Sequence, residues 1–213
     1  MNSRAIYFLH GLRDAYADQV DQIVVCGMVG PRGDGYRPGA RVDPDEAADY
    51  HLPQLAAFAA AGAGQAVAYT LTDPGEAIGV VRAARSVQLP VAVSFTVETD
   101  GRLPDGTALG EAIGQTDAAA APDYFMINCA HPTHVEPALT DAGDWRWRVL
   151  GIRSNASTQS HAELDESPEL DDGDPDGFGA EHTRLRAALP ELTVLGGCCG
   201  TDRRHVASLW GVG

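Results

Sequence analysis

The sequence predicts an α/β fold built on a parallel sheet. Short apolar runs alternate with longer segments of helical periodicity, and six such runs are spread over the 213 residues. Alternating strands and helices are typical of a parallel sheet. Because the runs are continuously apolar, we expect both faces of the sheet to be covered. No linker divides the chain, so residues 1–213 are predicted to form a single domain.

The predicted elements follow one another in a regular order. A helical pattern over residues 3–18 opens the chain, and a glycine-rich loop at residues 27–39 follows the first strand. The next helix has the clearest start, since Asp43 suits the N-cap and Pro44 the first position. The predicted strands are residues 22–26, 66–69, 90–95, 124–127, 148–152 and 193–195. The later helices are residues 44–62, 75–86, 107–115, 133–142, 178–189 and 201–210, with an acidic loop at residues 163–176. Six such steps suit a doubly wound sheet or part of a (β/α)8 barrel equally well.

The charge of the chain excludes two classes of partner. Thirty acidic residues stand against 15 basic ones, all of them arginine, for a net charge of -15. Such a surface repels nucleic acid and anionic membranes. No apolar run approaches the ~20 residues that span a bilayer. The start of the chain lacks the apolar core of a signal peptide. Four cysteines without the spacing of a small disulfide scaffold indicate a reducing compartment, so a cytoplasmic location is predicted.

Three cysteines form the most informative pattern in the sequence. Cys198 and Cys199 follow Gly196 and Gly197 at the end of the last predicted strand, and Cys129 follows Asn128 at the end of another. Three thiolates at the ends of two strands suit a zinc ion with one open coordination position. Paired cysteines after two glycines also occur as small buried residues in a tight turn. The third cysteine, in a matching position, favours the metal site.

Other patterns leave alternatives open. His131 and His134 form Cys-x-His-x-x-His with Cys129, which is an alternative ligand set. The same segment also suits a helix start in which Thr133 is the cap and His134 is exposed. The glycine-rich loop could bind an anion through its backbone N–H groups, or it could be a mobile lid or a plain connection. The acidic segment does not match the spacing of an EF-hand, which favours a solvated loop over a calcium site. Cys26 lies within a predicted strand and is expected to pack in the core.

Five motifs together resemble the homocysteine S-methyltransferase family over nearly the whole chain. They are Val29–Gly33, Val93–Thr96, Ile127–Cys129, Ser154–Ala156 and Gly196–Thr201, in the order of that family. The resemblance implies a (β/α)8 TIM-type barrel with zinc at its C-terminal mouth. About six βα units are present, corresponding to barrel strands three to eight, so an incomplete barrel without its first two strands is expected. The open edges of such a barrel favour a homo-oligomer that covers them.

The resemblance also implies a reaction. A methyl group passes from a sulfonium or quaternary ammonium donor to the thiol of homocysteine, forming methionine. Zinc is held by Cys129, Cys198 and Cys199, while Asn128 and Thr70 contribute to the substrate site. Both partners are small molecules.

Two departures from the family pattern leave other functions open. Tyr69 stands where the family has a glutamate that helps to hold the ammonium group of the amino acid, and a tyrosine cannot supply that charge. Arg32 replaces the aromatic residue of a Gly-Pro-Tyr-Gly pattern. A non-catalytic zinc-binding homologue, or a methyltransferase for a thiol without the α-amino group, therefore remains an alternative.

Overall fold

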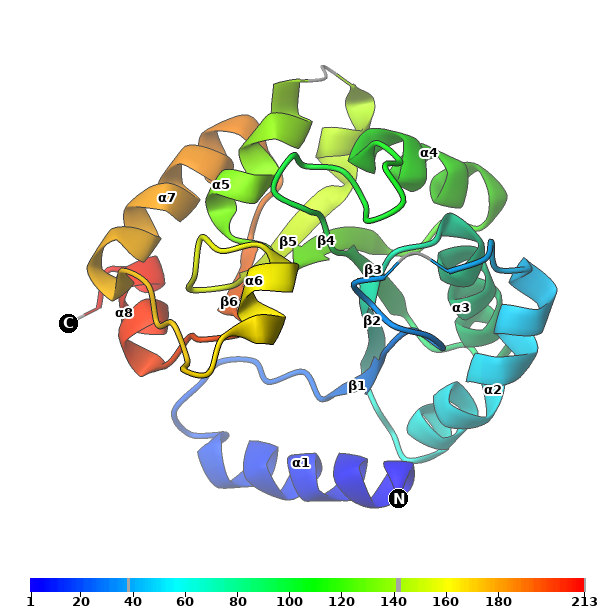
Figure 1. Ribbon diagram of the computed structural model, residues 1–213. Coiled ribbons are helices and arrows are strands. Elements are labelled where there is room, and N and C mark those ends of the chain that lie inside the picture. Colours follow the sequence, from blue (N-terminus) through cyan, green and yellow to red (C-terminus); the bar gives the residue numbers. More distant parts are fainter. Residues whose placement is uncertain (38, 141–142, 213) are drawn as a thin grey trace.

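The computed structural model describes residues 1–37, 39–140 and 143–212. Six parallel strands form one sheet in the order of the sequence. They are Cys26–Val29 (β1), Gln65–Leu71 (β2), Val91–Phe95 (β3), Tyr124–Asn128 (β4), Val149–Ser154 (β5) and Val194–Gly197 (β6). A doubly wound sheet reverses its strand order at a switch point, so this sequential order excludes it. The sheet curls with its helices outside, which confirms the incomplete TIM-type barrel (Figure 1).

The helices surround the sheet. They are Asn2–Tyr16 (α1), Pro44–Ala60 (α2), Pro74–Ser86 (α3), Leu109–Ala119 (α4), Pro132–Val135 (α5), His161–Glu166 (α6), Pro175–Ala188 (α7) and Arg203–Trp210 (α8). Two 3-10 helices, Glu136–Thr140 (η1) and Asp144–Arg148 (η2), precede β5. In Figure 1, α1 lies on the side of the molecule between α2 and α8. No helix in the described part of the chain is long and apolar enough to cross a membrane.

The main core lies between the sheet and the surrounding helices. Phe95 and Phe125, on neighbouring strands, are fully buried there and stack with their ring centroids 6.2 Å apart. A smaller cluster of Val67, Ala92 and Met126 fills the concave side of the sheet. Each large apolar side chain removed from water in this way stabilises the fold by about 1.5–3 kcal/mol.

The first strand lies further along the chain than predicted. β1 covers residues 26–29 rather than 22–26, because its parallel partner β2 begins at Gln65, which pairs with Cys26. Residues 22–25 precede the partner strand: Val25 O still accepts from the Gly64 N–H, but the ladder itself begins at Cys26. Gly27 belongs to the strand and not to the loop: a Cβ at this position would overlap the ring of Phe58 on α2. The glycine is therefore required by helix packing.

Two segments differ in their secondary structure from the prediction. The predicted helix at 133–142 is a short α5 followed by η1, because Pro137 lacks the N–H that would continue an α-helix; residues 141–142 lie outside the described residues. The acidic segment is not all loop. Ser160 and Glu163 form a capping box that starts α6. Asp174 is the N-cap of α7, which begins at Pro175, three residues before the predicted start at residue 178.

A glycine in α3 sets how closely two helices approach. Gly79 is buried, and a Cβ there would lie 2.6 Å from the carbonyl oxygen of Pro44 and would also collide with Ala47. We expect Gly79→Ala to destabilise the protein by about 1–3 kcal/mol, although alanine is the better helix former. Gly114 in α4 is the matched control, since a Cβ there meets nothing within 4 Å. Gly114→Ala should stabilise by up to about 1 kcal/mol in urea unfolding. Equal effects of the two changes would contradict this account.

Candidate metal centre

Three cysteines lie at the C-terminal edge of the sheet, on either side of β5. Cys129 follows β4, and its backbone N–H donates to Arg153 O at 3.0 Å. Cys198 follows β6, and its N–H donates to Ser154 O at 2.7 Å. Both cysteines are thus held against β5, the strand between them, by backbone hydrogen bonds.

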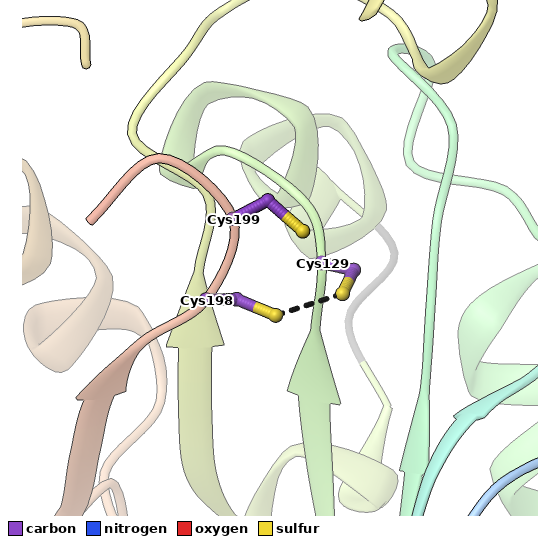
Figure 2. A group of neighbouring side chains, drawn as sticks. All are labelled: Cys129, Cys198 and Cys199. Carbon is purple, nitrogen blue, oxygen red and sulfur yellow. Dashed lines mark hydrogen bonds between the residues drawn. The ribbon is translucent and has the colours of Figure 1, made fainter. Parts of the chain in front are cut away.

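The three sulfur atoms converge (Figure 2). All lie within 4.8 Å of one another, and the Cys129 and Cys198 sulfurs are 2.8 Å apart. Tetrahedral zinc with Zn–S bonds of about 2.3 Å needs sulfurs roughly 3.8 Å apart, which lies between these values. Cys129 is buried, Cys198 is half-buried and Cys199 is exposed, so the group opens on the side of Cys199. The donor set fits a thiophilic metal with one position left for a ligand.

The thiols perturb one another strongly. Hydrogen bonds from Cys198 and Cys199 lower the pKa of the Cys129 thiol, and Tyr36 and Thr70 add to this effect. Donating to Cys129 in turn raises the pKa of Cys198. Without a cation, the three sulfurs share protons through these hydrogen bonds, and Cys129 is the thiol that ionises most readily. A bound divalent cation would allow all three to ionise, which couples metal binding to proton release.

Thr70 and Asn128 lie directly beside the cysteines. Asn128 Oδ1 accepts hydrogen bonds from the Thr70 N–H at 2.8 Å and from Ser94 Oγ at 2.6 Å, while its Nδ2 donates to Thr70 Oγ1 at 2.8 Å. Thr70 Oγ1 lies 3.9 Å from the Cys129 sulfur. Thr70 and Cys129 have positive φ angles of 58° and 54°. Such left-handed backbone is costly for a β-branched residue and is concentrated at functional sites.

Two residues that sequence reasoning gave no role hold the Cys129 loop. The side chain of Asn155 donates to Cys129 O at 3.0 Å and accepts from the Cys199 N–H at 3.1 Å. His161 Nε2 also donates to Cys129 O, at 2.6 Å, while its Nδ1 lies 3.0 Å from Glu98. Asn155 lies in a motif of the family pattern, whereas His161 stands alone in an acidic segment, where no sequence signal identifies it.

A cavity of about 580 Å³ opens beside Cys199. The glycine-rich loop contributes three residues to its wall, including Tyr36, whose ring lies 4.3 Å from that of His161. Carboxylates dominate the charged groups that line it: Asp34, Glu98, Asp165, Glu169 and Asp171 face only Arg37 and His161. The cavity therefore has the size of a small-molecule site and favours a cationic occupant.

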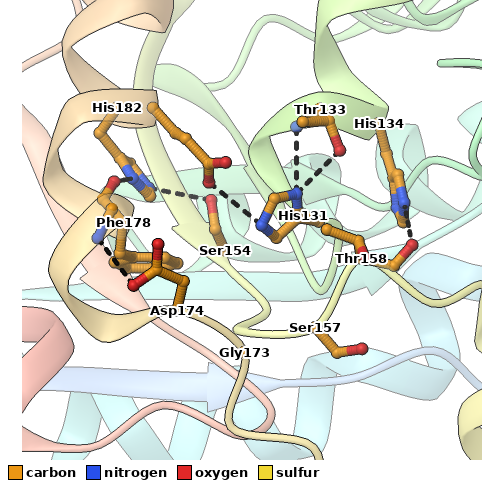
Figure 3. A network of polar contacts seen from close by, with 12 residues as sticks. His131, Thr133, His134, Ser154, Ser157, Thr158, Gly173, Asp174, Phe178 and His182 are labelled. Atoms are coloured by element: carbon orange, nitrogen blue, oxygen red, sulfur yellow. Dashed lines mark hydrogen bonds and ion pairs between the residues drawn. The ribbon is translucent and has the colours of Figure 1, made fainter.

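The histidines near Cys129 do not join the metal cluster. Among the described residues, only the three cysteines bring enough ligand atoms together. Figure 3 shows His131 and His134 in a separate polar network. The His131 ring accepts from the Thr133 N–H and lies 3.1 Å from Glu181, and His134 donates to Thr158 O. His131 is thus the cap of α5 in place of Thr133, and His134 is buried rather than exposed.

Burial keeps these histidines neutral. It lowers the pKa of His131 to about 4, helped by the nearby His134 and His182. It also lowers the pKa of His134 and of His182, whose ring donates to Phe178 O and accepts from Ser154. A histidine whose pKa is lower in the folded state stabilises the fold above pH 6.5 and loses that contribution as the pH falls.

We expect the metal-free, reduced protein to lose stability between pH 7.5 and 5.5. Each buried neutral histidine accounts for up to about 1.4 kcal/mol per pH unit below its unfolded pKa. His182→Asn keeps a donor for Phe178 O but cannot titrate. It should be less stable at pH 7.5 and show a shallower pH dependence in urea unfolding. A wild-type stability that is constant or rises toward pH 5.5 would contradict the assignment of neutral buried histidines.

Tyr69 lies on the concave side of the sheet, where its ring packs against Val67, Ala92 and Met126. The guanidinium of Arg153, on β5, lies over this ring with its Cζ 5.0 Å from the centroid. A cation therefore occupies the neighbourhood in which the family pattern led us to look for an anion.

Comparison with known proteins agrees with the fold. The chain is 22% identical over 193 residues to homocysteine S-methyltransferase YbgG of Bacillus subtilis, covering 87% of this chain and 60% of that protein. It thus spans about 60% of the length of this relative. The metallated form of the homocysteine methyltransferase MmuM from Escherichia coli superposes with a TM-score of 0.76 at 20% identity, over 99% of this chain and 69% of that one. A chitinase from Chromobacterium violaceum shares the fold at a TM-score of 0.53 and 15% identity, over 99% of this chain and 83% of that one. The family model for homocysteine S-methyltransferase matches residues 1–210. The chain belongs to the homocysteine S-methyltransferase family.

Proposed function

We propose that this protein transfers a methyl group to a thiol at a zinc ion held by Cys129, Cys198 and Cys199. The observation that carries the proposal is the convergence of three cysteine sulfurs within 4.8 Å at the C-terminal edge of a curled parallel sheet. In TIM-type barrels this edge carries the active site. Homocysteine is the first acceptor to test, with methionine as the product.

Zinc is the metal that best suits these residues. Thiolate ligands select soft metals, and a zinc site with three protein ligands keeps a fourth position open. When bound, the metal would coordinate the acceptor thiol and lower its pKa, so that the sulfur is present as a nucleophile near neutral pH. Asn155 and the backbone of β5 hold the two cysteine loops next to each other, so that all three sulfurs can reach one ion.

The acidic cavity beside Cys199 supports a cationic methyl donor. Sulfonium and quaternary ammonium groups are both cations, and carboxylates surround this space. In the reaction, a lone pair of the acceptor sulfur forms the new S–C bond while the C–S⁺ or C–N⁺ bond of the donor breaks. The electron pair of that bond stays on the leaving group, which departs as a neutral thioether or tertiary amine. The thiol proton goes to solvent.

Thr70 and Asn128 have a narrower part in this proposal. The oxygen and the nitrogen of the Asn128 side-chain amide are both engaged by Thr70 and Ser94. Asn128 therefore acts on the substrate by positioning Thr70. The Thr70 hydroxyl, 3.9 Å from the Cys129 sulfur, is the group of this pair that is close enough to contact a bound thiol.

The test combines metal content with turnover. Purified protein should contain about one zinc per chain, and it should form methionine from homocysteine with S-methylmethionine or betaine as the donor. Zinc without turnover of any thiol would favour the non-catalytic homologue. Tyr69 in place of the expected glutamate is the observation that supports this alternative. No zinc in the folded protein would overturn the proposal.

A further inference from the structure

Arg153 lies on the concave side of the sheet, next to the metal centre. It stands on β5, in register with Asn128 of β4, which directly precedes Cys129, and with Gly196 of β6, two positions before Cys198. Its Nε donates to Gly197 O at 3.1 Å, and its guanidinium packs over the ring of Tyr69. These two contacts fix the orientation of the half-buried side chain.

The charge of Arg153 has no carboxylate partner among the described residues. Its charged neighbours are the thiol groups of Cys198 and Cys129, together with the Tyr69 hydroxyl. The other cations around the site differ in this respect. Arg32 pairs with Glu76, and Arg37 pairs with Asp34 and Asp165. Arg153 is thus a half-buried cation that no carboxylate balances in the described part of the chain.

An anion is what such a group binds best. A guanidinium presents a planar fork of donors that matches a carboxylate, and half-burial strengthens the hydrogen bonds that it makes. Nε is engaged by Gly197 O, and the Tyr69 hydroxyl also hydrogen-bonds to the side chain, so the remaining N–H groups of the two terminal nitrogens are the donors left for a ligand. The position of Gly197 next to Cys198 sets this fork beside the metal ligands.

We propose that Arg153 binds the carboxylate of the acceptor, and that the acceptors of this protein are short mercaptocarboxylates in which an α-amino group is not required. The inference rests on the proposed function, since it places the acceptor thiol at the metal. It follows from the position of Arg153 over Tyr69: the guanidinium can bind a carboxylate, and neither side chain supplies a negative charge that would bind an ammonium group.

A different role for Arg153 makes a distinct prediction. Three thiolates on a divalent ion carry a net charge of about -1, which a nearby guanidinium would balance. If that were its only role, removing Arg153 would weaken metal binding and leave the choice among thiols unchanged.

The experiment uses three thiols related to homocysteine. They are homocysteine itself, 4-mercaptobutyrate, which lacks the amino group, and 3-mercaptopropylamine, which lacks the carboxylate. Each is titrated into the Co²⁺-loaded 213-residue protein, and the visible absorption of the cobalt reports thiol binding without any turnover. Because the three thiols ionise to different extents at one pH, each dissociation constant is calculated from the concentration of the thiolate form. Arg153→Gln removes the charge, Arg153→Lys keeps it, and Arg82→Gln is the matched control, since Arg82 pairs with Asp45 on the surface.

We expect 4-mercaptobutyrate to bind at least as tightly as homocysteine and about 10-fold or more tighter than 3-mercaptopropylamine. Arg153→Gln should reduce this preference to about 3-fold or less with cobalt still bound, Arg153→Lys should keep part of it, and Arg82→Gln all of it. Two results would overturn the inference about Arg153 and leave the proposed function standing. One is that the thiols bind the wild-type protein in a different order of affinity, and the other is that the preference for the carboxylate persists in Arg153→Gln. Loss of cobalt from Arg153→Gln would assign Arg153 to charge balance. If no thiol alters the cobalt spectrum, the proposed function fails as well.

Discussion

Replacing Cys198 with serine is expected to abolish stoichiometric zinc binding. Cys198 is half-buried, its sulfur lies 2.8 Å from that of Cys129, and its N–H is bonded to β5. A serine hydroxyl at this position remains protonated near neutral pH and is a poor zinc ligand. Even loss of an indirect partner costs about 10–100-fold in metal affinity, so loss of a direct ligand should cost more than about 100-fold.

The measurement is zinc per chain after gel filtration, followed by competition with a chromogenic chelator. Cys26→Ser is the matched control, because Cys26 is the fourth cysteine and lies at the start of β1, outside the cluster. The control should keep about one zinc per chain. Zinc retained by Cys198→Ser at wild-type affinity would show that the cysteines are packing residues in a tight turn, as the sequence also allowed.

The cysteine cluster could be predicted because it depends on simple rules. Parallel strands end at one edge, so residues that follow Asn128 and Gly197 must lie near each other whatever the details of the loops. The start of α2 was equally predictable, since Asp43 accepts from the backbone N–H groups of Asp45 and Glu46 as an N-cap should. Both signals are local, and the topology does the rest.

What could not be predicted depends on contacts between distant segments. The start of β1 is set by where β2 begins, almost 40 residues later. Tyr36 reaches the cysteine site from a glycine-rich loop and His161 from the first residue of α6, and nothing in the sequence around either residue indicates that contact. The helix α6 is a different case. Its capping box, Ser160 with Glu163, is visible in the sequence and was hidden only by the acidic composition around it.

The proposals divide the site by charge. The cavity on the Cys199 side carries carboxylates and suits a cationic donor, while Arg153 and Tyr69 on the concave side of the sheet suit an anionic acceptor. The sulfurs lie between the two. Such a separation would orient both substrates before reaction and would keep each from binding in the place of the other, because the wrong substrate would meet a like charge.

Asn155→Ala is expected to damage both the metal site and the fold. The Asn155 side chain is buried and joins the two cysteine loops, donating to Cys129 O and accepting from Cys199 N–H. Its removal takes the side-chain acceptor from the Cys199 N–H, at about 1–3 kcal/mol, whereas Cys129 O keeps its hydrogen bond from His161. We therefore expect a loss of about 1–3 kcal/mol in the free energy of unfolding of the metal-free protein. Zinc affinity should fall by about 10–100-fold, because the ligands are no longer held at the spacing that the ion requires.

Two further variants separate positioning from general instability. Gln115→Ala removes an exposed amide on α4 that bonds only to Glu111, and it should leave both quantities nearly unchanged. Gly79→Ala destabilises the fold away from the metal site and should leave zinc affinity unchanged as long as the protein is folded. If Asn155→Ala lost stability to the same extent as Gly79→Ala but kept wild-type zinc affinity, Asn155 would have only a structural role in the segment after β5, and the cysteines would hold their positions without it.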